Sequence, residues 1–140
     1  MIGIDTGSVI AFENKDHAEH AATVGAIQGL RRRGERIAIC PQVIAEFIHV
    51  VTDPRRFASP LTMQQALDRG FAWQASTEIC RIYPDDEAMR WFHLWMKQHQ
   101  LGRKRVLDTM LAATYRAAGI DRLLTTNQGD FTIFDWFEFG

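Results

Sequence analysis

Short apolar segments alternate along this chain with longer segments of helical periodicity, and this alternation restricts the fold more than any other feature of the sequence. Strands are expected at residues 1–4, 36–40, 78–83, 120–125 and 132–136. Helices are expected at residues 8–12, 16–33, 41–53, 61–73, 84–101 and 103–118. Gly34 and Gly119 follow two of these helices, where glycine commonly ends a helix. Because strands that alternate with helices form a parallel sheet covered on both faces, the sequence predicts an α/β fold.

The bulk properties of the chain fit one globular domain, residues 1–140, with a core of its own. Hydrophobic residues make up 46% of the sequence and charged residues 24%, and the net charge of −1 indicates no general affinity for polyanions. Cys40 and Cys80 lie among apolar residues, which favours buried, reduced thiols. No segment resembles a membrane span or a cleavable leader, so a cytoplasmic location is expected.

The first candidate for a functional residue is Asp5, which follows the apolar segment Ile2-Gly3-Ile4. Ligands of open α/β sheets bind outside the carboxyl ends of the strands, so an acid in this position suits a binding site. Asp5 is equally well placed to cap the helix expected after it, by accepting hydrogen bonds from backbone amides. The residues around it allow both interpretations.

Two further acids lie within expected helices. Glu46 shares a polar helix face with Gln42 and His49, and such a face is by default exposed to solvent. Asp108 stands in an otherwise apolar helix. A carboxylate can stabilise the start of a helix through the helix dipole. However, a buried charge without a partner is costly, so the apolar surroundings of Asp108 favour a functional role.

Polar groups also gather after the fourth expected strand, in the segment Thr125-Thr126-Asn127-Gln128-Gly129-Asp130. Asn, Gly and Asp form turns, and a turn and a functional site are compatible in the same residues. The basic run Arg103-Lys104-Arg105 lies close to Asp108 and would attract a phosphate backbone in a salt-dependent way. By contrast, the acidic run Asp85-Asp86-Glu87 follows a proline and is expected to cap a helix.

The acids that follow strands should meet at one edge of the sheet, together with those on the helices. Carboxylates that are crowded together repel one another, so such a cluster normally requires a cation. Oxygen ligands suit hard ions such as Mg²⁺ or Mn²⁺. The sequence therefore points to a divalent-metal enzyme.

At these positions the chain resembles the PIN-domain family, and in particular the VapC-type toxin ribonucleases. The resemblance is carried, in chain order, by Ile4–Ala11, Pro41–Phe47, Val106–Thr114, and Leu123–Asn127 followed by Asp130-Phe131. It implies a three-layer α/β/α sandwich with a parallel sheet of four or five strands. It also implies an Mg²⁺- or Mn²⁺-dependent endoribonuclease, the toxin of a type II toxin–antitoxin system, with RNA as substrate.

The same resemblance implies that Asp5, Glu46 and Asp108 bind the metal. The family often has a fourth acid where this chain has Asn127, so either Asn127 or Asp130 completes the catalytic set. A homodimer and a cognate antitoxin protein are further implications. Because the fourth acid is replaced by an amide, the alternative is a catalytically weakened PIN-fold module that binds RNA or a partner protein. The aromatic tail, residues 131–139, is expected either to pack in the core or to form an interface.

Overall fold

A single parallel sheet of five strands lies at the centre of the molecule in the computed structural model, which describes all residues 1–140. The strands are β1 (Ile2–Ile4), β2 (Ile37–Ile39), β3 (Ile79–Arg81), β4 (Arg122–Leu124) and β5 (Glu138–Phe139). Their order is β3-β2-β1-β4-β5, and every neighbouring pair is parallel. The chain therefore moves outward from β1 as far as β3 and then returns to the other side of β1.

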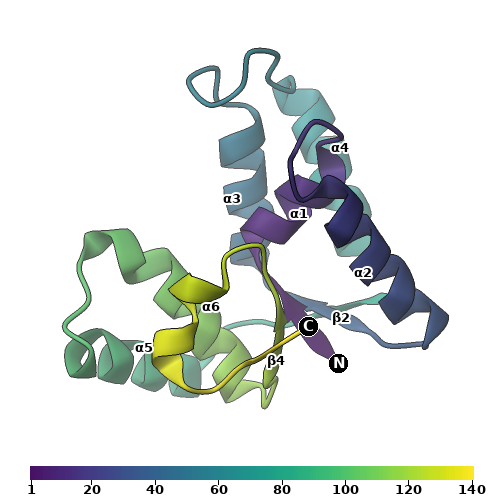
Figure 1. Cartoon of the computed structure of the whole chain (residues 1–140). Coiled ribbons are helices and arrows are strands. Elements are labelled where there is room, and N and C mark those ends of the chain that lie inside the picture. The colour runs from purple at the N-terminus through teal and green to yellow at the C-terminus, as the bar shows by residue number, and fades with distance from the viewer.

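The helices form two layers, one on each face of the sheet. They are α1 (Thr6–Glu13), α2 (His20–Arg32), α3 (Pro41–Val51), α4 (Met63–Ala75), α5 (Asp86–Gln98) and α6 (Val106–Ala117), with 3₁₀ turns η1 (Arg103–Arg105), η2 (Gln128–Asp130) and η3 (Thr132–Phe134). Helices α1 to α4 pack on one another, whereas α5 packs on α6 (Figure 1). The predicted α/β/α sandwich is confirmed. None of the helices combines the length and the apolar character that crossing a membrane requires.

Several helix boundaries lie where the sequence predicted them. Gly34 follows α2 with φ of +67°, and Gly119 follows α6 with φ of +71°. This left-handed conformation favours glycine and ends a helix. At the start of α5, the Asp85 carboxylate accepts a hydrogen bond from the backbone amide of Ala88 at 2.9 Å. The acidic run at 85–87 therefore caps a helix, as expected.

Two predicted elements are wrong in position. The fifth strand was expected at 132–136, but Thr132–Phe134 is a 3₁₀ turn and the strand follows at Glu138–Phe139. The reason is that Phe131 and Phe134 are both buried, and a spacing of three residues suits a helical turn rather than a strand. The helix expected from residue 16 begins at His20, because Asn14 accepts hydrogen bonds from the backbone of the residues after it and forms a turn first.

Tyr115 joins α6 to the centre of the sheet. Its side chain is fully buried, and its hydroxyl lies 2.7 Å from the carbonyl oxygen of Ile4 and 3.0 Å from that of Ala38. The ring lies against β1 at Gly3, where an added Cβ would approach two ring carbons to 2.8 Å. Glycine at position 3 therefore permits the close approach of α6 to β1, the strand that precedes Asp5.

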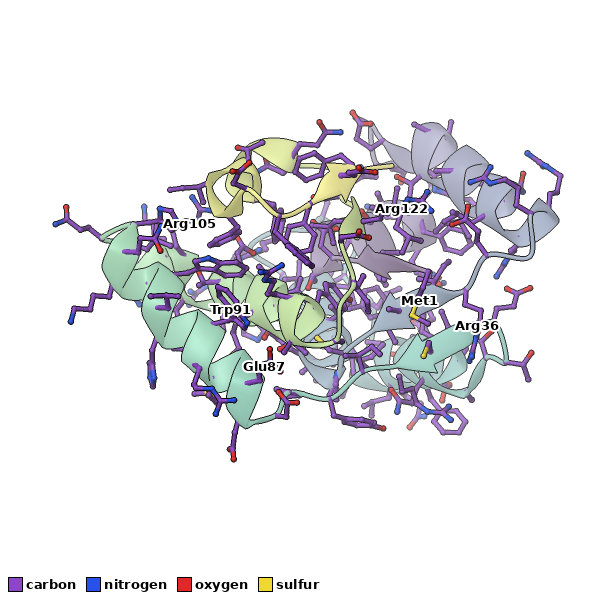
Figure 2. The ribbon with its side chains drawn as sticks, turned by 90° about the horizontal axis from the view of Figure 1, so that it is seen from below. Met1, Arg36, Glu87, Trp91, Arg105 and Arg122 are labelled. Atoms are coloured by element: carbon purple, nitrogen blue, oxygen red, sulfur yellow. The ribbon has the colours of Figure 1, made fainter.

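The aromatic tail packs against α5 and α6, which confirms the first of its two expected arrangements. Phe131 and Phe134 belong to the core. The Arg116 guanidinium of α6 lies between two indole rings, 4.5 Å from the centroid of Trp91 and 3.3 Å from that of Trp136. Figure 2 shows Trp91 on α5 beside α6. Cation–π stacking thus fixes the C-terminal segment to this layer of helices.

We expect Gly3→Ala to destabilise the protein by about 1–3 kcal/mol, because the new methyl group would overlap the rigid ring of Tyr115. Chemical denaturation measures the effect. The matched control is Gly25→Ala in α2, where an added Cβ meets no atom within 4 Å. The control should stabilise the protein by about 0.5–1 kcal/mol, since alanine favours helices over glycine. Equal effects of the two substitutions would contradict the close approach of Tyr115 to β1.

Candidate active site

The candidate site lies at the carboxyl edge of the sheet, between β1 and β4, where the strand order reverses. Asp5 directly follows β1 and Thr125 directly follows β4. The two strand ends are joined, because the backbone amide of Asp5 donates to the carbonyl oxygen of Leu124 at 3.3 Å. In open α/β sheets this is the place where ligands bind.

Asp5 has both of the roles that its sequence context allowed. It is only 7% exposed, and its Oδ1 accepts a hydrogen bond from the backbone amide of Ser8 at 2.8 Å, which caps α1. Its Oδ2 accepts a hydrogen bond from Thr125 Oγ1 at 2.6 Å. Burial raises the pKa of Asp5, the hydrogen bonds from Thr125 and Ser8 lower it, and the charge of Asp130 raises it further. The carboxylate is therefore held in place by two partners and lies close to a second acid.

Glu46 faces α6 as well as solvent, which the default interpretation of its polar helix face did not predict. Gln42 Nε2 donates to Glu46 Oε1 at 2.6 Å and also lies 2.7 Å from the carbonyl oxygen of Leu107. Gln42 thus connects α3 to the first turn of α6 and orients the Glu46 carboxylate. The sequence analysis missed this role of Gln42, although its spacing of four residues from Glu46 was the available signal.

Asp108 lies in the first turn of α6 and, unlike the other three acids, accepts no hydrogen bond from the protein. Burial and the charges of Asp130, Glu46 and Asp5 together raise the pKa of Asp108 to about 6, although Arg105 lowers it in part. Carboxylates from four separate segments therefore lie within electrostatic range of one another. These are four of the residues that the sequence singled out as candidates for one site.

The fourth carboxylate of this group comes from Asp130 and not from position 127. Asn127 Nδ2 donates to Asp130 Oδ2 at 2.5 Å, and the backbone amide of Asp130 donates to the carbonyl oxygen of Asn127 at 3.2 Å. The Asn127 side chain therefore supports Asp130, which carries the charge. The charge of Asp130 raises the pKa of both Asp5 and Asp108.

The donor set of this site suits a hydrated hard cation. No three His, Cys, Asp or Glu side chains lie close enough to hold one ion together. Mg²⁺ is usually held by one or two carboxylates and keeps several water ligands, so it does not need such a cage. Glycine at position 7 lets the Thr126 hydroxyl lie near Asp5, because an added Cβ would lie 2.8 Å from Thr126 Oγ1 and 3.6 Å from Asp5 Oδ2. The residues therefore fit a hydrated Mg²⁺ or Mn²⁺ ion.

The fold and the acids together define an α/β sandwich with an acidic site where the strand order reverses. The family model for the PIN domain matches residues 2–135, and the chain belongs to this family.

Named relatives agree with this assignment. Ribonuclease VapC24 of Mycobacterium tuberculosis is 26% identical over an alignment 145 positions long, which covers 96% of this chain and 91% of the relative. The crystal structure of Mycobacterium tuberculosis VapC20, described as a sarcin-ricin loop cleaving toxin, superposes with a TM-score of 0.74 at 19% identity and covers 99% of this chain and 98% of that one. VapBC2 from Rickettsia felis, bound to a promoter DNA fragment, has a TM-score of 0.67 at 20% identity, with 99% and 98% covered.

We expect Asp130→Asn to lower the pKa of Asp108 below its value of about 6 in the metal-free protein, because the substitution removes the carboxylate charge that raises it most. Carboxyl ¹³C NMR titration measures this pKa. Asparagine can still accept the hydrogen bond from Asn127, so the turn keeps its shape. Asp135→Asn, at an exposed residue on the same segment, is the matched control and should leave the pKa of Asp108 unchanged. An unchanged pKa in Asp130→Asn would show that the two acids lie too far apart to interact.

Proposed function

We propose that this protein is a divalent-metal-dependent endoribonuclease and the toxin of a type II toxin–antitoxin pair. The observation that carries this proposal is the convergence of Asp5, Glu46, Asp108 and Asp130 at the carboxyl edge of a PIN-domain sheet. Its relatives named VapC are ribonucleases, and solved structures with the same fold include toxin–antitoxin complexes. We further propose that residues 1–140 act as one domain in the cytoplasm.

PIN-domain ribonucleases generally use divalent metal ions. We infer that Asp5, Glu46 and Asp108 hold Mg²⁺ or Mn²⁺, in part through water, and that Asp130 adds charge to the site. A divalent ion in such a site makes water a stronger nucleophile at neutral pH and offsets charge on the leaving oxygen of the phosphodiester.

The contribution of the chain is to fix the carboxylates before the ion and the substrate arrive. Thr125 and Ser8 orient Asp5, while Gln42 orients Glu46 and Asn127 orients Asp130. Side chains that are already oriented lose little freedom when they bind a ligand, so these contacts support both metal affinity and rate. Asp108 has no such partner, which leaves both of its oxygens available.

The substrate is proposed to be a single-stranded segment of a folded RNA. The exposed cations Arg103 and Lys104 lie directly before α6, close to the site, and suit the phosphate backbone. Unstacked loops offer a backbone that can enter a narrow acidic site. The description of VapC20 as a toxin that cleaves a loop is consistent with this substrate class.

A cognate antitoxin is the proposed protein partner, and a homodimer the proposed assembly. Several solved structures with this fold are described as complexes: VapBC-1 from Haemophilus influenzae, VapBC2 with promoter DNA, and FitAB with a DNA fragment. The second candidate function is a PIN-fold module that binds RNA or a partner without cleaving, which Asn127 favours by lacking the charge of an acid. Because Asp130 supplies a carboxylate beside Asn127, the nuclease is the better-supported function.

We expect Asp5→Asn and Asp108→Asn each to reduce Mg²⁺-dependent RNA cleavage by at least about 100-fold. Loss of a residue that only supports a metal ligand costs about 10–100-fold in activity, so loss of a ligand should cost at least as much as the upper value. Gel analysis of cleaved RNA measures the rate, and circular dichroism verifies the fold. Asp121→Asn is the control, because Asp121 is exposed and precedes β4 at the opposite edge of the sheet. Full activity of Asp5→Asn would refute the proposed site.

We expect Mn²⁺ or Mg²⁺ to raise the Tm of the protein, and to raise it more at pH 7.5 than at pH 5. The sign follows from Asp108, whose pKa of about 6 means that it must lose its proton to bind a cation. At about ten times the Kd, binding stabilises the native state by about 1.4 kcal/mol. For a domain of this size the Tm should rise by about 4 °C. The absence of any shift at millimolar metal would favour the non-catalytic module.

A further inference from the structure

Arg105 differs from the two basic residues before it. Arg103 and Lys104 are exposed, whereas Arg105 is half-buried and its Nη2 donates to the main-chain carbonyl oxygen of Asp130. Figure 2 shows Arg105 beside the C-terminal segment, in the yellow part of the chain. Arg105 also immediately precedes α6, the helix that carries Asp108. Its guanidinium therefore connects the segments that hold two of the four acids.

The contacts of Arg105 hold it firmly in this position. Its amide donates to the carbonyl oxygen of Gly102 at 3.0 Å, and its own carbonyl oxygen accepts from Thr109 Oγ1 at 2.6 Å. The Nε–H is buried and has no hydrogen-bond partner. In the planar guanidinium, Nε–H lies on the same edge as one of the two N–H groups of Nη2. A buried donor without a partner lowers stability, so a folded protein that keeps one requires an explanation.

Apart from Arg105, the hydrogen bonds of the segment that Arg105 contacts are local. Residues Asn127 to Gly129 are exposed and are ordered by the 3₁₀ turn η2 and by the hydroxyl groups of Thr125 and Thr132. Asn127 accepts from the backbone amide of Asp130 and donates to its carboxylate, whereas Arg105 donates to its carbonyl oxygen. The Arg105 contact is therefore the hydrogen bond that ties this turn, and with it the Asp130 carboxylate, to the start of α6.

From these contacts we propose that Arg105 is a positioning residue, which holds the Asp130 carboxylate in the acidic site through the Asp130 carbonyl group. The inference rests on the proposed function in so far as the site binds a metal. A positioning role predicts a change in metal affinity opposite to the one that the charge of Arg105 alone predicts. A cation beside a metal site repels the metal, so its removal should strengthen metal binding if charge alone matters. If Arg105 positions Asp130, its removal weakens metal binding despite the lost repulsion.

Two substitutions separate these effects. Arg105→Met removes the charge and the donors, and Arg105→Lys keeps the charge but loses the planar fork. Titration calorimetry with Mn²⁺ alone, without RNA, should show that both variants bind about 10–100-fold more weakly, as does Asp130→Asn. The double variant Arg105→Met/Asp130→Asn should be no weaker than Asp130→Asn, because both changes remove the same carboxylate from the site. Lys104→Met, which removes an exposed neighbouring cation, should bind within about twofold of the parent protein.

A second measurement does not depend on metal. Amide hydrogen exchange at Asp130 and Phe131, whose N–H groups bond within the turn, should be faster in Arg105→Met and Arg105→Lys but not in Lys104→Met. Exchange in α2 verifies that each variant is folded. Unchanged exchange in the turn, or Mn²⁺ binding by Arg105→Met as tight as in the parent protein, would overturn the proposal. If the parent protein binds no Mn²⁺ while the turn still loosens, the positioning role stands and the proposed metal-dependent function fails.

Discussion

The contact between Tyr115 and β1 is the constraint on which the site depends. Tyr115 is two turns after Asp108 on α6, and its hydroxyl lies against the carbonyl oxygen of Ile4, the residue before Asp5. Because an α-helix is rigid over two turns, the contacts of Tyr115 with β1 and β2 restrict the distance between the first and the third acid. Gly3 allows the contact by leaving room for the ring. A packing feature of the core thereby sets the geometry of a polar site at its edge.

The arrangement of the four carboxylates is electrostatically unfavourable. Like charges at short range destabilise the folded chain, and burial adds to this cost, as the raised pKa values of Asp5 and Asp108 show. The chain offsets the cost with Thr125, Gln42 and Asn127, each of which donates to one carboxylate. Asp108 accepts no such hydrogen bond, so the repulsion from the other three carboxylates is least offset at this residue. Destabilisation of this kind is typical of sites that bind a cation or a substrate.

Much of the fold could be predicted from local patterns, because apolar periodicity and left-handed glycines are properties of short segments. The alternation of strands and helices and the ends at Gly34 and Gly119 are examples. The strand expected at 132–136 was wrong because Phe131 and Phe134 are both buried, and the burial of both depends on packing with distant residues such as Trp95 of α5. The roles of Gln42 and Arg105 were hidden for the same reason. Each side chain meets a backbone group of a segment that is distant along the chain.

The order in which these parts occur along the chain has a consequence for synthesis. Thr125, Asp130 and the edge strand β5 all lie near the C-terminus, after the central strands and the helices that cover them. A polypeptide still emerging from the ribosome therefore has neither the hydroxyl that orients its first acid nor its fourth carboxylate. For a nuclease of the proposed kind, synthesis must proceed past Asp130 before the chain can harm the RNA of the cell that makes it. This delay gives an inhibitor time to meet the newly made protein.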